Sequence, residues 1–158
     1  MKYVFKTIIL LLSLIIIGCN PNRLYNERIE IPNMIWHQDS LLNFNINVED
    51  ANLAYDIKIS IRSNVYFQSR NLWLFINTTS PSGLTQRDTI ECMLSDEKGN
   101  ILGDASGDII DYEIPFKNNI KFSTKGIYKF SIQHGMRMEK LPCVDEIGII
   151  LDKKTEDN

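Results

Sequence analysis

The sequence predicts an all-β protein, folded as a single β-sandwich of jelly-roll or immunoglobulin-like type. Three observations support this prediction. Several segments alternate apolar and polar residues at every step, as half-buried strands do. These segments recur about every ten residues and are separated by turns rich in Gly, Pro, Asn and Asp. After residue 19, no segment has the 3.6-residue apolar period of an amphipathic helix.

The alternation is clearest in three segments, at residues 42–48, 55–62 and 126–133. In each, the apolar set predicts a face against the core and the polar set predicts a face toward water. We favour a sandwich over a barrel because several strands keep one polar face. The alternation does not distinguish a jelly roll from an immunoglobulin-like Greek key.

The other strands are predicted from shorter signals. Residues 25–31 should form an edge strand that ends at Pro32. Residues 72–76 are apolar without alternation, which predicts a strand that is covered on both faces or lies at the centre of a sheet. Trp36 is expected to be half-buried where the chain enters the fold. Further strands are expected at 88–94, 111–116, 120–122 and 147–151.

The first nineteen residues predict export. Lys2 and Lys6 come before an uncharged apolar run at residues 7–17, and Gly18 and Cys19 follow it. A basic start, a short apolar run and a small residue at the cleavage site are the parts of a signal peptide. The run is shorter than the roughly 20 residues that a membrane-spanning helix needs. Ile16-Ile17-Gly18-Cys19 resembles a bacterial lipobox, in which the cysteine is lipidated and the chain is cut before it.

This start predicts the domain organisation. We expect a lipoprotein signal peptide at 1–18, a lipidated tether at 19–24, a β-sandwich at 25–152 and a charged tail at 153–158. A lipobox cysteine carries three acyl chains, which is enough for a stable anchor in a bilayer. The alternative is an uncleaved N-terminal membrane helix.

The composition argues against nucleic acid as a partner. The whole chain has a formal charge of −3, and removing Lys2 and Lys6 with the leader takes it to about −5. An acidic domain lacks the basic surface that phosphate backbones or anionic lipid require. The apolar and charged fractions, 44% and 23%, are those of an ordinary folded protein.

Two cysteines, Cys92 and Cys143, remain once Cys19 is lipidated. Export exposes them to an oxidising compartment, so a disulfide between them is one hypothesis. Two separate buried thiols are the alternative, since free cysteine packs as a small hydrophobe. His37 and His134 could complete a zinc site only if the fold gathered all four side chains. We expect no metal and no cofactor.

The sequence also lacks the motifs of known enzyme classes. It contains no G-x-S-x-G, no phosphate-binding G-x-x-x-x-G-K-S/T and no H-E-x-x-H. Asp104 and Asp108 flank a loop of small residues, but a calcium loop offers more oxygen ligands than these two. We therefore expect a protein that is not an enzyme.

Three segments resemble one family, the GldH gliding-motility lipoproteins of Bacteroidetes. Residues 62–75 are similar to its R-N-x-x-Y-x-x-x-N-L-W segment. Residues 88–103 are similar to D-T-I-E-C-x-L-A-D-x-x-G-x-W-x-G, and residues 126–137 match G-x-Y-x-F-x-I-x-x-x-M-R. Ser63 and Ile101 depart from the pattern, where the family often has Asn and Trp. The resemblance covers nearly the whole chain after the lipobox.

The resemblance implies a non-enzymatic envelope protein that is needed for gliding and is associated with type IX secretion. Its partners would be other gliding and secretion proteins of the envelope. Trp73 and Phe75 would belong to the core, with Tyr128 and Phe130. Arg62 and Arg137 would pair with acidic neighbours, and the alternative is that these arginines, with Trp73, form a partner-binding hot spot.

Two further expectations concern location and an alternative function. No acidic run follows Cys19, which favours an outer-membrane anchor facing the periplasm over export to the cell surface. A carbohydrate-binding lipoprotein is the alternative function, since β-sandwiches often bind sugars on exposed aromatic rings. That alternative predicts a shallow groove lined by Trp36, Tyr66 or Phe67.

Overall fold

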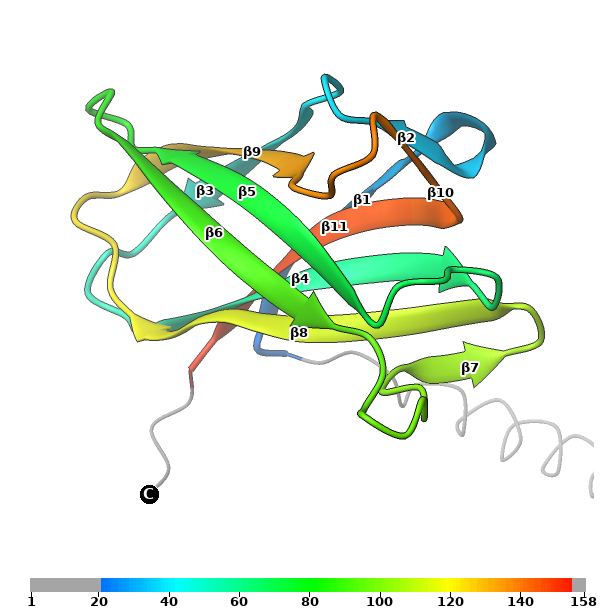
Figure 1. Cartoon of the computed structure of the whole chain (residues 1–158). Helices are drawn as coiled ribbons and strands as arrows, with labels where there is room; N and C mark the ends of the chain where they lie inside the picture. The colour runs from blue at the N-terminus through cyan, green and yellow to red at the C-terminus, as the bar shows by residue number, and fades with distance from the viewer. Residues whose placement is uncertain (1–20, 155–158) are drawn as a thin grey trace, which may run out of the picture.

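Two antiparallel β-sheets pack face to face in the computed structural model, which describes residues 21–154 (Figure 1). The predicted all-β sandwich is confirmed. The predicted signal peptide, Cys19 and the last four residues of the predicted tail lie outside the described residues.

Eleven strands are found in the described part of the chain. The five-stranded sheet has the order β1-β11-β4-β8-β7, formed by Arg23–Glu30, Val144–Lys153, Tyr55–Asn64, Ile109–Ile120 and Asp104–Ser106. The four-stranded sheet has the order β3-β9-β5-β6, formed by Leu42–Val48, Gly126–His134, Asn71–Thr79 and Thr85–Met93. A small sheet pairs β2, Ile35–His37, with β10, Lys140–Pro142, and a 3-10 turn, η2, covers Pro32–Met34. No helix among residues 21–154 is long and apolar enough to cross a bilayer.

The strand order decides the topology that the alternation left open. Counted along the chain, the eight long strands lie in the order first, eighth, third and sixth in one sheet. In the four-stranded sheet, the long strands lie in the order second, seventh, fourth and fifth. This is the order of a jelly roll, in which the chain crosses repeatedly between the two sheets. The immunoglobulin-like alternative is therefore wrong.

The core lies between the inner faces of the two sheets. In β4, Ile57, Ile59 and Ile61 are each no more than 1% exposed, as their alternation predicts. Tyr128 and Phe130 of β9 are also buried, as expected from the family resemblance. Burying side chains of this size provides most of the driving force for folding, at about 25 cal/mol per Å² of apolar surface.

Trp36 and β5 differ from the predictions. Trp36 is buried rather than half-buried, at 1% exposure, because the β2–β10 pair closes over one end of the sandwich. In β5 the inner residues are buried, but Trp73 is 38% exposed and Phe75 is only partly buried. Trp73 and Phe75 point to the outer face because β5 alternates like the other strands. The alternative that both faces of β5 are covered is therefore wrong, and Trp73 does not belong to the core. The other alternative, a strand at the centre of a sheet, is correct, because β5 lies between β9 and β6.

Several strand bounds also differ. β1 begins at Arg23, inside the predicted tether, because the side chain of Arg23 binds Asp152 at 3.1 Å. β8 is one strand from Ile109 to Ile120, so no separate strand forms at 120–122. The full length of β8 was not predicted from the sequence, because Pro115 suggested that the strand ends there. Pro115 is tolerated because β7 pairs only with residues 109–111, which leaves the rest of that edge without a strand.

Both ends of the described chain lie at the same end of the sandwich, which we call the tether end. Arg23 pairs with Asp152 there, and Tyr55 pairs with both Lys153 and Ile120. The loops 49–54, 80–84 and 121–125 lie at this end too, because they join strands whose paired termini are there. A tether entering at Arg23 therefore places this end of the fold nearest its point of attachment.

We predict that Gly148→Ala destabilises the protein by about 2 kcal/mol or more. A Cβ at this position would lie 2.4 Å from the Glu27 carbonyl oxygen and 2.7 Å from Cγ of Arg28. The backbones of β1 and β11 would have to separate. Urea unfolding of the purified full chain measures the loss.

Ser60→Ala is the matched control for Gly148→Ala. Ser60 pairs with Gly148, and its buried Oγ has no hydrogen-bond partner. Removing an unsatisfied hydroxyl should leave stability unchanged or raise it by up to about 1 kcal/mol. An unchanged midpoint for Gly148→Ala would contradict the close contact between β1 and β11.

Candidate functional site

The outer face of the five-stranded sheet carries a closed ring of four charges around Arg62. Arg62 binds Asp111 at 3.1 Å and Glu146 at 3.1 Å. Arg28 binds the same two carboxylates, at 2.7 and 3.3 Å. The ring spans β1, β11, β4 and β8. Arg62 therefore has the acidic neighbours that were expected for it.

A second ring of four charges lies toward the tether end of the same face. Arg23 binds Glu113 at 3.2 Å and Asp152 at 3.1 Å. Lys58 binds the same two carboxylates, at 3.2 and 3.4 Å. Each ring holds two positive and two negative side chains, so neither leaves a net charge.

The rings cover residues that would otherwise face water. Ser60 and Ile150 lie on this outer face, yet both are 0% exposed. The stems of long basic side chains can cover such positions while their charged ends stay at the surface. Gly148 leaves room for Arg28 to cross β11 toward Asp111 on β8. Most charges of this face are therefore paired, whereas the exposed carboxylates of Glu30 and Asp104, on the same face, form no ion pair within residues 21–154.

The rings shift the acidities of their carboxylates. Partial burial raises the pKa of Asp111, but hydrogen bonds from Arg62 and Arg28 outweigh it, and the pKa lies below the usual 3.8. In the same way, burial of Glu113 is outweighed by Arg23 and Lys58, and its pKa lies below the usual 4.5. Both groups are therefore ionised at neutral pH.

The outer face of the four-stranded sheet is different, and it carries our candidate functional site. We call this site the Trp73 surface. It lies on β5, on β6 and on the segment that follows β9. Its members are large apolar or cationic side chains that are exposed or partly buried: Trp73, Phe75, Arg87, Met93 and Arg137, with Met136 at its edge, which also packs against the core. Within residues 21–154, no ion pair forms on this face, since those outside the rings lie elsewhere.

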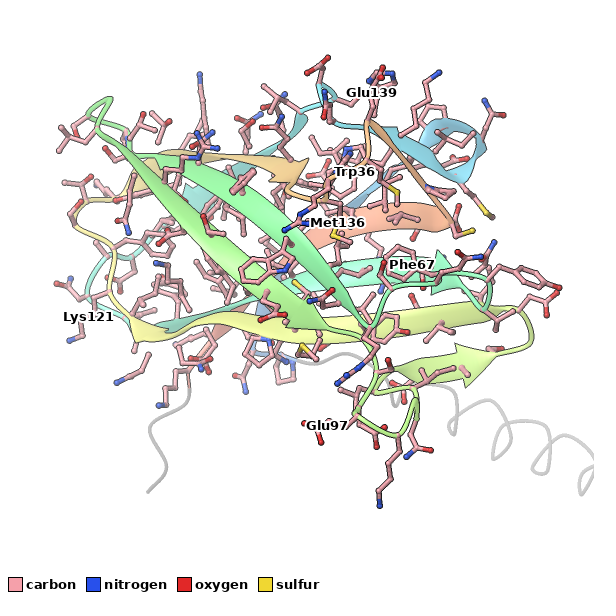
Figure 2. The ribbon with its side chains drawn as sticks, in the orientation of Figure 1. Trp36, Phe67, Glu97, Lys121, Met136 and Glu139 are labelled. Atoms are coloured by element: carbon pink, nitrogen blue, oxygen red, sulfur yellow. The ribbon has the colours of Figure 1, made fainter. Side chains whose placement is uncertain are left out.

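The backbone and packing hold the Trp73 surface in place. The Gly135 N–H donates to the Trp73 carbonyl at 2.7 Å, which brings the segment after β9 alongside β5. A Cβ on Gly135 would lie 3.0 Å from the Phe75 ring, so a larger residue would displace that ring. The Trp73 N–H points to the sulfur of Met136 at 3.4 Å (Met136 is labelled in Figure 2). The guanidinium carbon of Arg87 lies 4.7 Å from the centre of the Phe75 ring, a cation–π contact.

Arg137 differs from Arg62. It is exposed, and no hydrogen bond or ion pair of this residue is found within the described chain. The expected pairing of Arg137 with an acidic neighbour is therefore not formed. Trp and Arg are enriched at binding hot spots, and Trp73 and Arg137 are both exposed.

The sequence analysis missed three members of this surface. Met136 lies inside the G-x-Y-x-F-x-I-x-x-x-M-R segment, which was a usable signal. Arg87 and Met93 carry no comparable signal, because the outer face of β6 is defined only by its pairing with β5.

The disulfide hypothesis is wrong for this structure, in which Cys92 and Cys143 are both free. Cys92 is buried at the end of β6, in the four-stranded sheet. Cys143 lies in the turn between β10 and β11, with φ of 69°. Burial raises the pKa of the Cys92 thiol to about 12, so it is unreactive at neutral pH.

No metal site forms from the predicted ligands. Across residues 21–154, no three His, Cys, Asp or Glu side chains gather as a metal ion would need. His134 is 2% exposed, and its Nε2 lies 3.2 Å from the Trp36 carbonyl oxygen. Burial lowers its pKa below the usual 6.5, so the ring is neutral at pH 7. Asp104 and Asp108 are exposed.

The predicted sugar-binding groove does not form either. Trp36 is buried, and its Nε1 donates to the Ser40 carbonyl at 3.0 Å. Phe67 packs against the core, whereas Tyr66 is 69% exposed on the β4–β5 loop. Trp36 and Phe67 are labelled at separate positions in Figure 2. These three rings therefore do not line one binding surface.

Comparisons with known proteins agree with one another. A family model described as GldH lipoprotein matches residues 23–151. The gliding motility lipoprotein GldH homolog of Christiangramia forsetii is 32% identical, over 97% of this chain and 98% of its own length. The gliding motility lipoprotein GldH of Flavobacterium johnsoniae is 30% identical, over 92% of this chain and 90% of its own.

One solved structure is also similar, from the Gx strain of infectious bursal disease virus. It has a TM-score of 0.35 and 12% identity, and the match covers 89% of this chain and 36% of that chain. This likeness is too distant to bear on function.

We predict that the charge rings make stability depend on pH in the acid range. Because the folded-state pKa values of Asp111 and Glu113 lie below 3.8 and 4.5, their contribution is fully present above about pH 4.5. This contribution to stability is lost as the pH falls through the folded-state pKa values. Asp111→Asn should lower the free energy of unfolding by about 1 kcal/mol at neutral pH. It should also flatten the acid dependence, as measured by urea unfolding across a pH series.

Asp39→Asn is the matched control, since Asp39 is exposed and binds no other side chain in the described chain. It should leave both the stability and its pH dependence unchanged. An identical pH profile for Asp111→Asn and the parent protein would mean that the Arg62 ring contributes nothing in solution.

Proposed function

Because the chain belongs to the GldH lipoprotein family, we propose that it is a lipid-anchored, non-enzymatic component of the gliding machinery. The anchor is Cys19, behind a signal peptide at 1–18. The body is the jelly roll, which holds the Trp73 surface where another envelope protein docks. The names of the two relatives, both gliding motility lipoproteins, support the process. The type IX secretion machinery, whose cargo includes adhesins, is the proposed site of action.

The tether limits where the body can lie. Even fully extended, the segment from Cys19 to Arg23 spans at most about 14 Å. The tether end therefore stays close to the head groups of the membrane. The Trp73 surface lies on the side of the sandwich rather than at this end. A partner that lies next to the protein on the membrane can therefore contact it. We propose the outer membrane, with the body in the periplasm, because Asn20, Pro21 and Asn22 supply no acidic run after Cys19.

One observation carries the docking proposal, namely the difference between the two outer faces. Eight charges of the five-stranded sheet neutralise one another in two rings, so a partner would have to break these pairs to use them. On the other sheet, Trp73 and Met93 are 38% and 37% exposed, and Arg137 is unpaired within residues 21–154. Aromatic, Met and Arg side chains are the residues enriched at protein interfaces. Arg87 and Arg137 indicate a partner with acidic groups around an apolar centre.

We predict that Trp73→Ala and Arg137→Ala each impair gliding without unfolding the protein. Truncation of a hot-spot side chain costs at least about 2 kcal/mol of binding energy, or roughly thirtyfold in affinity. Both side chains are exposed, so thermal melting should be nearly unchanged. Single-cell gliding speed and in vivo cross-linking to neighbouring envelope proteins provide the measurements.

Tyr66→Ala is the control for these variants, because Tyr66 is exposed but lies on the β4–β5 loop, away from the Trp73 surface. It should glide and cross-link normally. If Trp73→Ala and Arg137→Ala also glide at the parent speed with unchanged cross-links, this surface is not the docking site.

We further predict that Cys19→Ala abolishes membrane anchoring. Without its acyl chains, the body has no strong attraction for a bilayer, since its charge is negative. On cell fractionation, variant protein that has lost its leader should no longer be found in the membrane sediment. Cys143→Ala, which removes a free thiol outside the lipobox, should stay with the membrane. A Cys19→Ala protein that sediments and supports gliding like the parent would overturn the anchoring proposal.

A further inference from the structure

A cavity of about 330 Å³ opens between the two sheets where β6 and β8 diverge toward the tether end (Figure 1). Both strands have a free edge at this point. β6 is the last strand of its sheet, and β7 covers only residues 109–111 of β8. The cavity wall is mainly apolar, with Ile57, Phe116, Ile120, Phe122, Tyr128 and Phe130. Its size is at the lower end of the range for ligand sites, which are about 300–1,000 Å³.

A β-bulge in β8 turns a lysine into the space between the sheets. Lys58 pairs with Pro115 and Ile57 pairs with Lys117, so Phe116 is the extra residue. Ile57 faces the core, and its partner Lys117 is therefore directed to the inner side as well. Bulges often redirect a side chain next to a functional site.

A carboxylate from the opposite sheet meets this lysine. Asp88 of β6 pairs with the buried Ile76 and so also faces inward. Its Oδ1 lies 2.9 Å from the Lys117 Nζ, and this ion pair joins the two sheets at the cavity. An inward-pointing charge can protect an edge strand from aggregation, but a lone charge suffices for that. The bulge, the paired charge and the apolar wall together form a cavity with a polar entrance.

The entrance carries an excess of positive charge and faces the membrane side of the molecule. Lys121 also lines the cavity, is exposed, and binds no acidic residue within the described chain. Figure 2 labels Lys121 at the tether end. The short segment after Cys19 keeps Arg23, which lies at this same end, within about 14 Å of a lipid-anchored cysteine.

We propose that this cavity binds one acyl chain of an anionic membrane lipid, whose head group lies against Lys121 and Lys117. The proposal rests on the proposed anchoring, because only anchoring brings the entrance to the bilayer. The aromatic and isoleucine side chains cover the hydrocarbon, and each buried methylene adds to the affinity. The polar residues of the lining are the groups that the head group would contact: Thr78, Gln86, Asp88, Lys117, Lys121 and Ser123.

The test uses the full lipidated chain in phosphatidylethanolamine vesicles that contain phosphatidylglycerol with a photoreactive diazirine in its acyl chain. Irradiation should label peptides from the cavity wall, those with Phe116 and Phe122. Gln86 lines the entrance, and its side-chain nitrogen lies 3.3 Å from Asp88 Oδ1. Gln86→Trp should therefore block the entrance and abolish the label.

Thr85→Trp is the matched control. Thr85 is the adjacent exposed residue of β6, but its hydroxyl meets that of Thr79 on the outer face of the sheet. It should be labelled like the parent, and melting curves should show both variants folded. Lys121→Glu should weaken labelling by phosphatidylglycerol, whereas Lys129→Glu, on the exposed face of β9, should not.

Two results would overturn the proposal. One is an absence of label in the cavity peptides while the protein still sediments with the vesicles, which would leave the anchor intact and the cavity empty or filled by the protein's own acyl chains. The other is equal labelling of Gln86→Trp and Thr85→Trp, which would mean that nearness to the bilayer suffices. Failure to sediment at all would instead contradict the anchoring from which this proposal starts.

Discussion

The attachment of β1 to the strands beyond its neighbour β11 depends on two rings of charge. β1 is an edge strand, with only β11 beside it, and it is the strand that continues from the tether. Arg23 and Arg28 reach past β11 to Glu113 and Asp111 on β8. Each ring includes side chains from four neighbouring strands. A mechanical force applied at the N-terminal end of β1 would therefore be shared by β1, β11, β4 and β8. A single exposed ion pair would add little, whereas a connected network gains more.

The same rings divide the surface of the molecule by role. On the five-stranded sheet, the two rings pair eight charges and Ile150 is buried, so little apolar or basic area of this face is left free. The opposite sheet presents Trp73, Met93 and Arg137, whose apolar area and charge remain free in the described chain. The tether end carries the cavity between β6 and β8. The anchoring, docking and lipid binding that we propose therefore involve different parts of one small domain.

The backbone explains why these surfaces are compatible with a single core. A strand sends alternate side chains to opposite faces, so β5 buries Leu72, Leu74 and Ile76 while it displays Trp73 and Phe75. The core keeps all of its buried β5 side chains although Trp73 and Phe75 face outward. Gly135 then allows the segment after β9 to approach β5, and it brings Met136 and Arg137 with it. The Trp73 surface is thus a product of the jelly roll rather than an addition to it.

Local pattern alone was enough to predict the all-β class, the strands β3, β4 and β9 and their buried faces, because a period of two is a property of each strand by itself. The lipobox and the family resemblance are likewise contained in short segments. Only the tertiary structure decided the jelly-roll order, the outward position of Trp73, the partners of Arg62 and the inward turn of Lys117. Arg62 meets Asp111 and Glu146 because β4 lies between β8 and β11. Such contacts join residues far apart in the chain, and local pattern carries no record of which strands become neighbours.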